Sequence, residues 1–321
     1  MHSFNELSAI FEEKFSKRHF PEHTPSLYDP AQYILGLKGK RVRPVCVLMG
    51  NELFADIVPD AYHIANAIEL FHNFSLIHDD IMDKAPLRRG METVHTKYGE
   101  STALLAGDAM LIQAYEYVVK IKPDHLQKTL QLFNKTAKEV CEGQQLDMDF
   151  EKRDTVSFEE YLNMITLKTS VLLAASLQLG AIIGGARESN QSQLYEFGKN
   201  LGIAFQIQDD YLDAFGDASL VGKQIGGDII ANKKTFLMIR AIETASASQQ
   251  KELKRLMTEN PADKVERVLQ IFKDSKADNW TKELKDQYLE TALKQLDDIA
   301  VLSSRKQPLT ELAEYLIERN K

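Results

Sequence analysis

The sequence predicts an all-α protein. Hydrophobic residues recur at helical spacing in nearly every segment of the 321-residue chain, and few stretches have the alternation typical of strands. The connections between these segments are short, and no low-complexity linker divides the chain. We therefore expect a single domain over residues 1–321, a helical bundle whose apolar faces point inward around a central cavity.

Prolines and periodicity set the expected elements at the start of the chain. Residues 3–17 have the charged, amphipathic pattern of a first helix. Pro21, Pro25 and Pro30 predict a loop, after which a short helix ends at Leu37.

Two further helices are expected before residue 84. Pro44 fits the first turn of one of them, where its missing N–H costs little. Pro59 and Asp60 offer the start of a long helix that continues to Asp83. Proline and glycine then predict a loop over residues 84–98.

Helical periodicity continues to the end of the chain, with one polar, glycine-rich loop expected over residues 215–227. The apolar run 171–185 is shorter than the roughly 20 residues that span a bilayer, so it predicts a buried core helix and no transmembrane segment. Further helices are expected over residues 101–120, 123–147, 157–183, 189–214, 233–244, 248–259, 262–273, 278–303 and 309–319.

The composition narrows the classes of function. The net charge is −8, which argues against a protein that binds nucleic acid. Cys46 and Cys141 are too few for a disulfide framework and lack metal-ligand spacing. The N-terminus has no signal-peptide core. A protein of the reducing cytoplasm is therefore expected.

Three carboxylates end the long helix. Asp79 and Asp83 are four residues apart and project from one helical face, with Asp80 beside them. Such a group repels itself unless cations lie between its members, and hard oxygen ligands suit Mg²⁺ together with phosphate oxygens. Arg88 and Arg89 follow, and arginine is a bidentate phosphate binder. The pattern indicates a metal-plus-diphosphate site, whereas a solvated acidic helix end is the plain alternative.

The same acidic spacing occurs again about 130 residues later, in Asp209, Asp210 and Asp213, three residues after Gln206. Each acidic group ends an apolar helical segment. Two such groups can face each other across the cavity of a helical bundle, so the repetition favours a shared metal site over two surface helix ends.

A basic stretch lies upstream of the first acidic group. Lys38, Lys40, Arg41 and Arg43 form a local cationic patch in an acidic chain. Cations at the start of a helix oppose its macrodipole, so an anionic ligand would relieve the conflict. A basic helix start on the surface is the alternative.

These motifs, spread over residues 36–235, resemble those of the trans-isoprenyl diphosphate synthases, also called polyprenyl synthetases, of the short-chain farnesyl or geranylgeranyl type. The resemblance implies the isoprenoid synthase fold, a homodimer, and Mg²⁺, roughly three ions per active site with substrate bound. It implies that isopentenyl diphosphate extends an allylic diphosphate (dimethylallyl, geranyl or farnesyl). The implied metal ligands are Asp79, Asp80, Asp83, Asp209, Asp210 and Asp213.

The resemblance also assigns the diphosphate contacts. Lys40, Arg43, His72 and Arg89 would bind isopentenyl diphosphate, although Lys38 replaces the first glycine of the family's GGKRxRP motif. The loop motif RRGxPTVH has Glu92 where proline is usual. The residues implied to bind the allylic substrate, or to line its site, are Arg88, Lys168, Thr169, Gln206, Lys223 and Lys233. Those implied to act in catalysis are Asp79, Asp80, Asp83, Arg88, Lys168 and Asp209.

Three smaller matches and departures accompany these assignments. Gln144 and Asp147 match the family's GQxxD, with a capping or surface role as the alternative. Asn232 replaces a usual glycine beside Lys233, and Leu237 replaces a usual proline, which affects the geometry of that loop.

Product length is expected to depend on the residues just before Asp79. A growing prenyl chain needs an apolar cavity, because exposing it to water costs about 0.8 kcal/mol per CH₂. Phe74 is the fifth residue before Asp79 and Ser75 is the fourth. In the family, an aromatic residue only at the fifth position is typical of geranylgeranyl enzymes, so a twenty-carbon product is expected and a fifteen-carbon product is the alternative. An ordinary core role for Phe74 is the competing interpretation.

Other functions compete with chain extension. A class I terpene cyclase also ionises an allylic diphosphate, but it would lack the GKRxRP patch. A non-catalytic prenyltransferase subunit would share the fold, although the intact second acidic group argues against it. A metal phosphohydrolase or di-iron bundle could use His78 with Asp79, or Glu69 and His72 as an ExxH pair. A di-iron bundle needs two such pairs on its helices, and the other match, Glu92 and His95, lies in the expected loop over residues 84–98.

Overall fold

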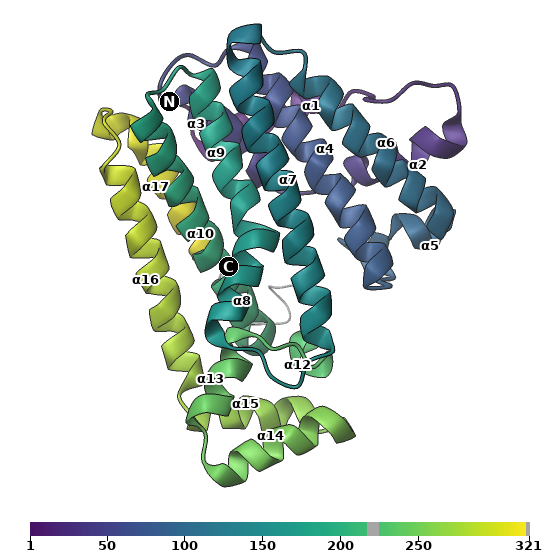
Figure 1. The fold of residues 1–321 in the computed structure, drawn as a ribbon, viewed down its shortest axis with the longest axis vertical. Helices are drawn as coiled ribbons and strands as arrows, with labels where there is room; N and C mark the ends of the chain where they lie inside the picture. Colours follow the sequence, from purple (N-terminus) through teal and green to yellow (C-terminus); the bar gives the residue numbers. More distant parts are fainter. Residues whose placement is uncertain (217–224, 319–321) are drawn as a thin grey trace. The chain divides into compact units, whose positions relative to one another are not determined.

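The computed structural model describes residues 1–216 and 225–318 and is almost entirely helical (Figure 1). Within those residues the β-structure is one short hairpin, in which Leu87–Arg88 (β1) pairs antiparallel with Met91–Glu92 (β2). The expected all-α class is confirmed.

The chain divides into two compact units. The first comprises Met1–Lys135, Ala175–Tyr195 and Ile299–Leu309, and the second comprises Thr136–Ala174, Glu196–Asp298 and Thr310–Lys321. A single domain over residues 1–321 stays a prediction, and each unit is described by itself below.

The first unit begins with α1 (Phe4–Phe15), which a capping box between Ser3 and Glu6 starts. The next helix, α2, spans Pro25–Gly36, so the loop expected around Pro25 and Pro30 is wrong. Pro25 is tolerated because it is the first helical residue. Pro30 lies inside the helix and is buried, at the loss of one backbone hydrogen bond.

The long helix α4 (Pro59–Met82) is the centre of the first unit. It packs against α6 (Glu100–Val118) and α3 (Val42–Glu52), and Figure 1 shows α4 and α6 running alongside each other. As expected, Pro44 is in the first turn of α3 and Asp83 caps the end of α4. The expected loop over residues 84–98 instead contains the hairpin and a short helix, α5 (Val94–Tyr98).

The middle of the chain contains α7 (Pro123–Glu151), α8 (Phe158–Ile165), a π-helical turn η1 (Thr166–Ser170), α9 (Val171–Ile183) and α10 (Glu188–Phe215). By length and composition alone the run Phe158–Ile183 could cross a membrane. However, 72% of its most apolar window is buried inside the protein, which is typical of a core helix.

The last third of the chain forms a further group of helices. Among them α13 packs against α15 and α16, and α14 packs against α15. Their bounds, with those of the last helix, are α12 (Gly227–Ile230), α13 (Phe236–Thr244), α14 (Ala247–Glu259), α15 (Lys264–Asp274), α16 (Ala277–Asp297) and α17 (Ser303–Ile317). The helix expected over 278–303 stops earlier, and α17 starts before the predicted residue 309 and includes Pro308.

Candidate active site

The end of α4 and strand β1 form a charged cluster in the first unit. Arg88 binds both carboxylate oxygens of Asp80, with Nε 2.8 Å from Oδ2 and Nη2 2.7 Å from Oδ1. The same Nη2 lies 3.5 Å from Asp79 Oδ2. Burial raises the pKa of Asp80, and the hydrogen bonds and charge of Arg88 oppose that rise. Arg88 therefore lies against Asp79 and Asp80, and Asp83 is exposed at the cap. Their roles toward metal and diphosphate stay predictions.

Arg89 joins the hairpin to the basic stretch. Its backbone is left-handed, with a φ of 55°, and its Nη1 donates to the carbonyl oxygen of Leu37 at 3.2 Å. A Cβ on Gly39 would lie 2.6 Å from that same Nη1, so a larger residue there would push the guanidinium away from the loop. Arg89 is thereby held beside the loop that contains Lys40, and the shared diphosphate role of the two residues stays a prediction.

His72 and Arg43 form a second contact in this region. His72 Nε2 lies 3.3 Å from Arg43 Nη1. Burial, reinforced by the positive charges of Arg43 and Arg89, holds the pKa of His72 well below its usual range. The ring is therefore neutral at pH 7, and its Nε2 accepts from the guanidinium.

Arg41 was noted in the sequence as part of the basic patch, and the structure gives it a different role from its neighbours. Its guanidinium is buried and donates to Glu69 Oε1 at 2.6 Å, to Glu12 Oε2 at 3.0 Å and to the carbonyl oxygen of Leu35 at 2.7 Å. Its backbone has a φ of 49°, just before α3 begins. Arg41 therefore fixes the turn between Lys40 and Arg43, and each of its three guanidinium nitrogens already donates to a protein oxygen.

The residues expected to limit product length lie together on α4. The ring of Phe74 is 4.7 Å from that of His78 and 5.7 Å from that of Phe71, measured between centroids. The Ser75 hydroxyl donates to the carbonyl oxygen of His72 at 2.8 Å. On α6, a Cβ at Gly107 would lie 2.4 Å from His78 Nε2, so the two helices leave no space there for a larger residue.

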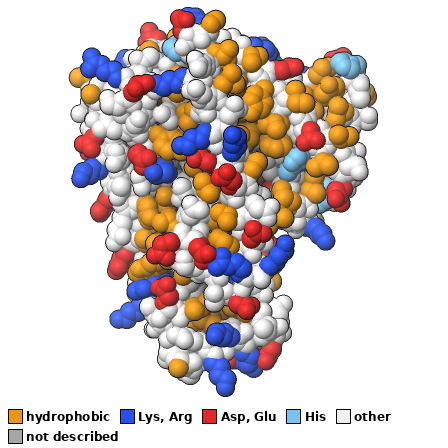
Figure 2. Space-filling model, viewed as in Figure 1, with side chains coloured by type: hydrophobic (Ala, Val, Ile, Leu, Met, Phe, Trp, Pro, Cys, Tyr) orange, Lys and Arg blue, Asp and Glu red, His pale blue; other side chains and the backbone are white. Residues whose placement is uncertain are grey.

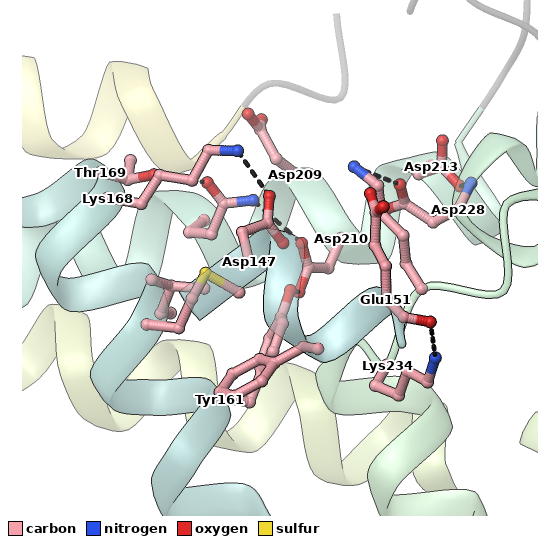
Figure 3. A pocket seen from close by; sticks show the side chains of 15 residues that line it. Asp147, Glu151, Tyr161, Lys168, Thr169, Asp209, Asp210, Asp213, Asp228 and Lys234 are labelled. Atoms are coloured by element: carbon pink, nitrogen blue, oxygen red, sulfur yellow. Dashed lines mark hydrogen bonds and ion pairs between the residues drawn. The ribbon is translucent and has the colours of Figure 1, made fainter. Parts of the chain in front are cut away.

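A cavity of about 240 Å³ opens in the second unit (Figure 3). Carboxylates and lysines converge on it from α7, the η1 turn, α10 and the segment after α12. Its lining residues include the predicted Lys168, Thr169, Gln206, Asp209, Asp210, Asp213 and Lys233. Residues from sequence positions far apart are thus brought into one site, whereas Lys223 lies outside the described residues.

The π-helical turn η1 presents Lys168 and Thr169 to the cavity. Lys168 Nζ lies 2.5 Å from Asp147 Oδ2, so the lysine has the anionic partner that its apolar helix required. A Cβ at Gly143 would lie 2.3 Å from the backbone nitrogen of Lys168, so α7 can approach the widened turn only at a glycine. Asp147 of the GQxxD match lines the cavity, and α7 continues beyond it to Glu151.

Asp210 is the most buried acid of the cavity. Its Oδ2 accepts from the Tyr161 hydroxyl at 2.9 Å, and its Oδ1 accepts from Gln206 Nε2 at 3.0 Å. Thr169 in turn donates to Gln206 Oε1 at 3.3 Å. Burial and then the charge of Asp228 raise the pKa of Asp210 to about 8. The sequence analysis missed Tyr161, although it lies seven residues before Lys168, two helical turns away.

Asp213 anchors the segment that follows. Its Oδ2 accepts from the backbone N–H of Asp228 at 2.9 Å, and its carbonyl accepts from Gly226 at 2.7 Å. Lys233 Nζ lies 3.7 Å from Asp228 Oδ1. Asp228 and Lys234, which were also absent from the predicted site, line the cavity as well.

The donor chemistry of both acidic groups fits Mg²⁺ that arrives with a diphosphate. Within residues 1–216 and 225–318, no three His, Cys, Asp or Glu side chains are arranged to hold a metal ion by themselves. Mg²⁺ is typically held by one or two carboxylates, with water and substrate phosphates completing its shell. Asp79 and Asp80 of the first acidic group and Asp209 of the second are carboxylates that would hold such ions.

Comparisons with known proteins agree with this chemistry. The family model described as polyprenyl synthetase matches residues 24–275. The chain is 39% identical over 310 residues to the geranylgeranyl pyrophosphate synthase of Geoglobus acetivorans, covering 96% of this chain and 94% of that one. It is 34% identical over 334 residues to the geranylfarnesyl diphosphate synthase of Natronomonas pharaonis, covering 98% and 96%. The structure of the geranylgeranyl pyrophosphate synthetase from Pyrococcus horikoshii Ot3 matches with a TM-score of 0.91 at 36% identity, covering 98% and 99%.

Proposed function

The chain belongs to the polyprenyl synthetase family and is a trans-prenyltransferase; on this premise we propose that it makes geranylgeranyl diphosphate. Isopentenyl diphosphate extends an allylic diphosphate, which can be the dimethylallyl, geranyl or farnesyl compound, and Mg²⁺ is the cofactor. The observation that carries the proposal is the cavity of the second unit, where lysines and carboxylates from four segments converge.

The residues of that cavity act on the leaving group. An allylic diphosphate must lose its diphosphate to form an allylic carbocation, and the negative charge that develops needs fixed positive partners. When bound, roughly three Mg²⁺ ions supply Lewis-acid stabilisation of that charge. Lys168 and Lys233 add theirs from the η1 turn and the segment after α12, and Arg88 and Lys223 complete the proposed set.

The second substrate is proposed to bind through the basic stretch of the first unit. Lys40, Arg43 and Arg89 provide cations for the diphosphate of isopentenyl diphosphate. Neutral His72, which accepts from Arg43, holds that guanidinium in place. The double bond of isopentenyl diphosphate attacks the allylic cation, and loss of a proton to the released diphosphate completes the step. No protein nucleophile is needed, and a closed site must exclude water from the cation.

A twenty-carbon product is supported by the arrangement on α4. Phe74 packs between the rings of Phe71 and His78 at the position expected to close the product cavity. Ser75 is small, and its hydroxyl bonds to the helix backbone, so it adds no second aromatic barrier. Relatives at 35–39% identity include several named geranylgeranyl diphosphate synthase, which favours this length over the fifteen-carbon alternative.

We propose a homodimer formed through α6. Leu105, Ile112 and Val119 repeat at seven-residue spacing, so they lie on one face of the helix. They are 58%, 63% and 56% exposed, and Figure 2 shows hydrophobic side chains gathered over α6. A stripe of this kind is self-complementary under two-fold symmetry and suits a second copy of the chain. A cytoplasmic location and the absence of a nucleic-acid partner remain part of the same proposal.

Incubation of the purified protein with labelled isopentenyl diphosphate, each allylic primer and Mg²⁺ tests the proposal. We expect a twenty-carbon prenyl diphosphate from every primer and no turnover after chelation of the metal. A fifteen-carbon end product would support the farnesyl alternative. A released hydrocarbon would indicate a cyclase, and product formation only after addition of a second subunit would indicate a non-catalytic partner.

A further inference from the structure

The segment between α12 and α13, residues 231–235, carries Lys233 at the edge of the cavity. We refer to it as the Lys233 loop. The backbone N–H of Lys233 donates to the carbonyl oxygen of Asp228 at 2.9 Å, while its ammonium lies 3.7 Å from the Asp228 carboxylate. The Lys233 side chain is 44% exposed, so its direction is not set by burial. Contacts that fix the backbone of the loop also help to determine where this cation points.

Asn232 supplies the first of these contacts. Its backbone is left-handed, with a φ of 57°, a conformation that glycine adopts more easily. Its side chain, however, makes two hydrogen bonds that glycine cannot make. Asn232 Oδ1 accepts from Lys264 Nζ at 2.6 Å, and its Nδ2 donates to the carbonyl oxygen of Met257 in the last turn of α14 at 3.1 Å. Asparagine at this position therefore fastens the loop to both α14 and α15.

Lys264 is a buried cation that donates to neutral oxygen atoms. It is 2% exposed, it is the first residue of α15, and its ammonium also lies 3.4 Å from the carbonyl oxygen of Ile230. No Asp or Glu of the described residues 1–216 and 225–318 lies within ion-pair distance of it, and burial lowers its pKa. Burying an ammonium beside neutral acceptors is expensive. Methionine or leucine would pack in the core without this cost. What lysine adds at this position is its hydrogen bonds to the loop.

The other side of Lys233 is fastened as well. Lys234 is 8% exposed and donates to the carbonyl oxygen of Glu151, the last residue of α7, at 3.4 Å. Figure 3 shows this contact, with the Lys234 ammonium directed toward the end of α7. Lys233 is thus flanked by two residues whose side chains bind different helices.

We propose that Lys264 and Asn232 are positioning residues, which hold the Lys233 loop so that the Lys233 ammonium meets the allylic diphosphate. The inference rests on the proposed function, because it needs Lys233 to contact that substrate. Neither positioning residue touches substrate. Their effect passes entirely through the loop, so it should disappear when Lys233 itself is removed.

A double-mutant cycle between Lys264→Met and Lys233→Ala tests this coupling. Lys264→Met keeps an apolar stem of similar size and removes the donor. We expect it to raise the KM for the allylic substrate about tenfold, the size of a lost charge-assisted hydrogen bond, and to change the KM for isopentenyl diphosphate less than about twofold. In the Lys233→Ala background, Lys264→Met should change the allylic KM by less than about twofold. Lys254→Met, an exposed lysine of α14, is the matched control and should change neither constant.

Asn232→Gly is an independent test, because it does not place a new methionine in the core as Lys264→Met does. Glycine suits the left-handed backbone, so a purely structural role predicts an unchanged or higher Tm and an unchanged KM. A positioning role for Asn232 predicts instead that the variant has a higher KM for the allylic substrate, even though its Tm is unchanged or higher. Mg²⁺ with inorganic pyrophosphate should raise the Tm of the parent protein. We expect this rise to be smaller in both Lys264→Met and Asn232→Gly.

Three results would overturn the inference: equal rises in both KM values, a Lys264→Met effect that persists at full size without Lys233, or an Asn232→Gly enzyme with the parental allylic KM. Failure of the proposed function would look different. In that case Lys233→Ala alone would leave the allylic KM unchanged, or the parent protein would form no prenyl product.

Discussion

Replacing Phe74 with alanine should lengthen the product. The ring of Phe74 lies on α4 against those of Phe71 and His78, five residues before the first aspartate. Phe74 is only partly buried, so its loss should cost no more than about 1–3 kcal/mol of folding free energy. The space that a phenyl ring occupies is comparable to that of one isoprene unit, so one further condensation can be accommodated.

The size of the effect follows from burial of that additional unit. Moving five carbons out of water stabilises the complex by about 4 kcal/mol, at about 0.8 kcal/mol per carbon. Since each 1.4 kcal/mol is about a factor of ten, the longer intermediate would be favoured by roughly two to three orders of magnitude over one left in water. Imperfect filling of the space could remove half of this gain and still leave a twenty-five-carbon product in the majority.

Labelled isopentenyl diphosphate with farnesyl diphosphate as primer, followed by dephosphorylation and reverse-phase separation, measures the product lengths. Ser75→Ala is the control on the next position of α4 and should leave the distribution unchanged. Ser75→Phe should shorten the product to fifteen carbons. Gly107→Ala should shorten it too, because the new Cβ would lie 2.4 Å from His78 Nε2 and push that ring aside. A folded Phe74→Ala enzyme with the parental distribution would refute the assignment and place the cavity floor elsewhere.

Three further predictions concern the metal, the second substrate and the thiols. Asp79→Ala and Asp209→Ala should each lower kcat by about two orders of magnitude or more. Their circular dichroism spectra should match that of the parent protein. A near-parental rate in either variant would show that catalysis does not need both acidic groups. Arg43→Ala should chiefly raise the KM for isopentenyl diphosphate, and a rise confined to the allylic KM would reverse the subsite assignment. Burial raises the pKa of Cys46 to about 12, so almost none of this thiol is ionised at pH 8. A thiol reagent should therefore label only the exposed Cys141 in the native protein. Labelling of both thiols without denaturant would contradict this prediction.

Short-range spacing explains why much of the site could be predicted. Asp79 and Asp80 lie within one helical turn, and Arg88 follows close enough that the hairpin returns it to them. For Lys168 the sequence indicated an anionic partner, expected to be the allylic diphosphate, and the structure places the Asp147 carboxylate beside it. A local feature thus indicated the chemistry near each cation, although it did not identify Asp147.

Contacts between distant residues could not be predicted in this way. Nothing in the residues around Tyr161 indicates that its hydroxyl meets Asp210, because 49 positions separate them. Gly39 was noted only as part of a motif, and its close contact with Arg89 appears only in the structure. Helix boundaries failed where proline was treated as a breaker, since tertiary packing keeps Pro30 and Pro308 inside helices.

The π-helical turn at Thr166–Ser170 has a consequence for how this chain tolerates changes in length. A π-turn holds one residue more than an α-turn, so deleting any one of its five residues would restore a continuous α-helix. Because the shortened turn would still complete one revolution, the residues of α9 would keep their faces relative to α8. A residue added or removed elsewhere in this helix would instead rotate everything beyond it by about 100° and turn the apolar surface of α9 away from its neighbours. We therefore expect single-residue gaps in related sequences, where they occur within residues 158–183, to fall at residues 166–170.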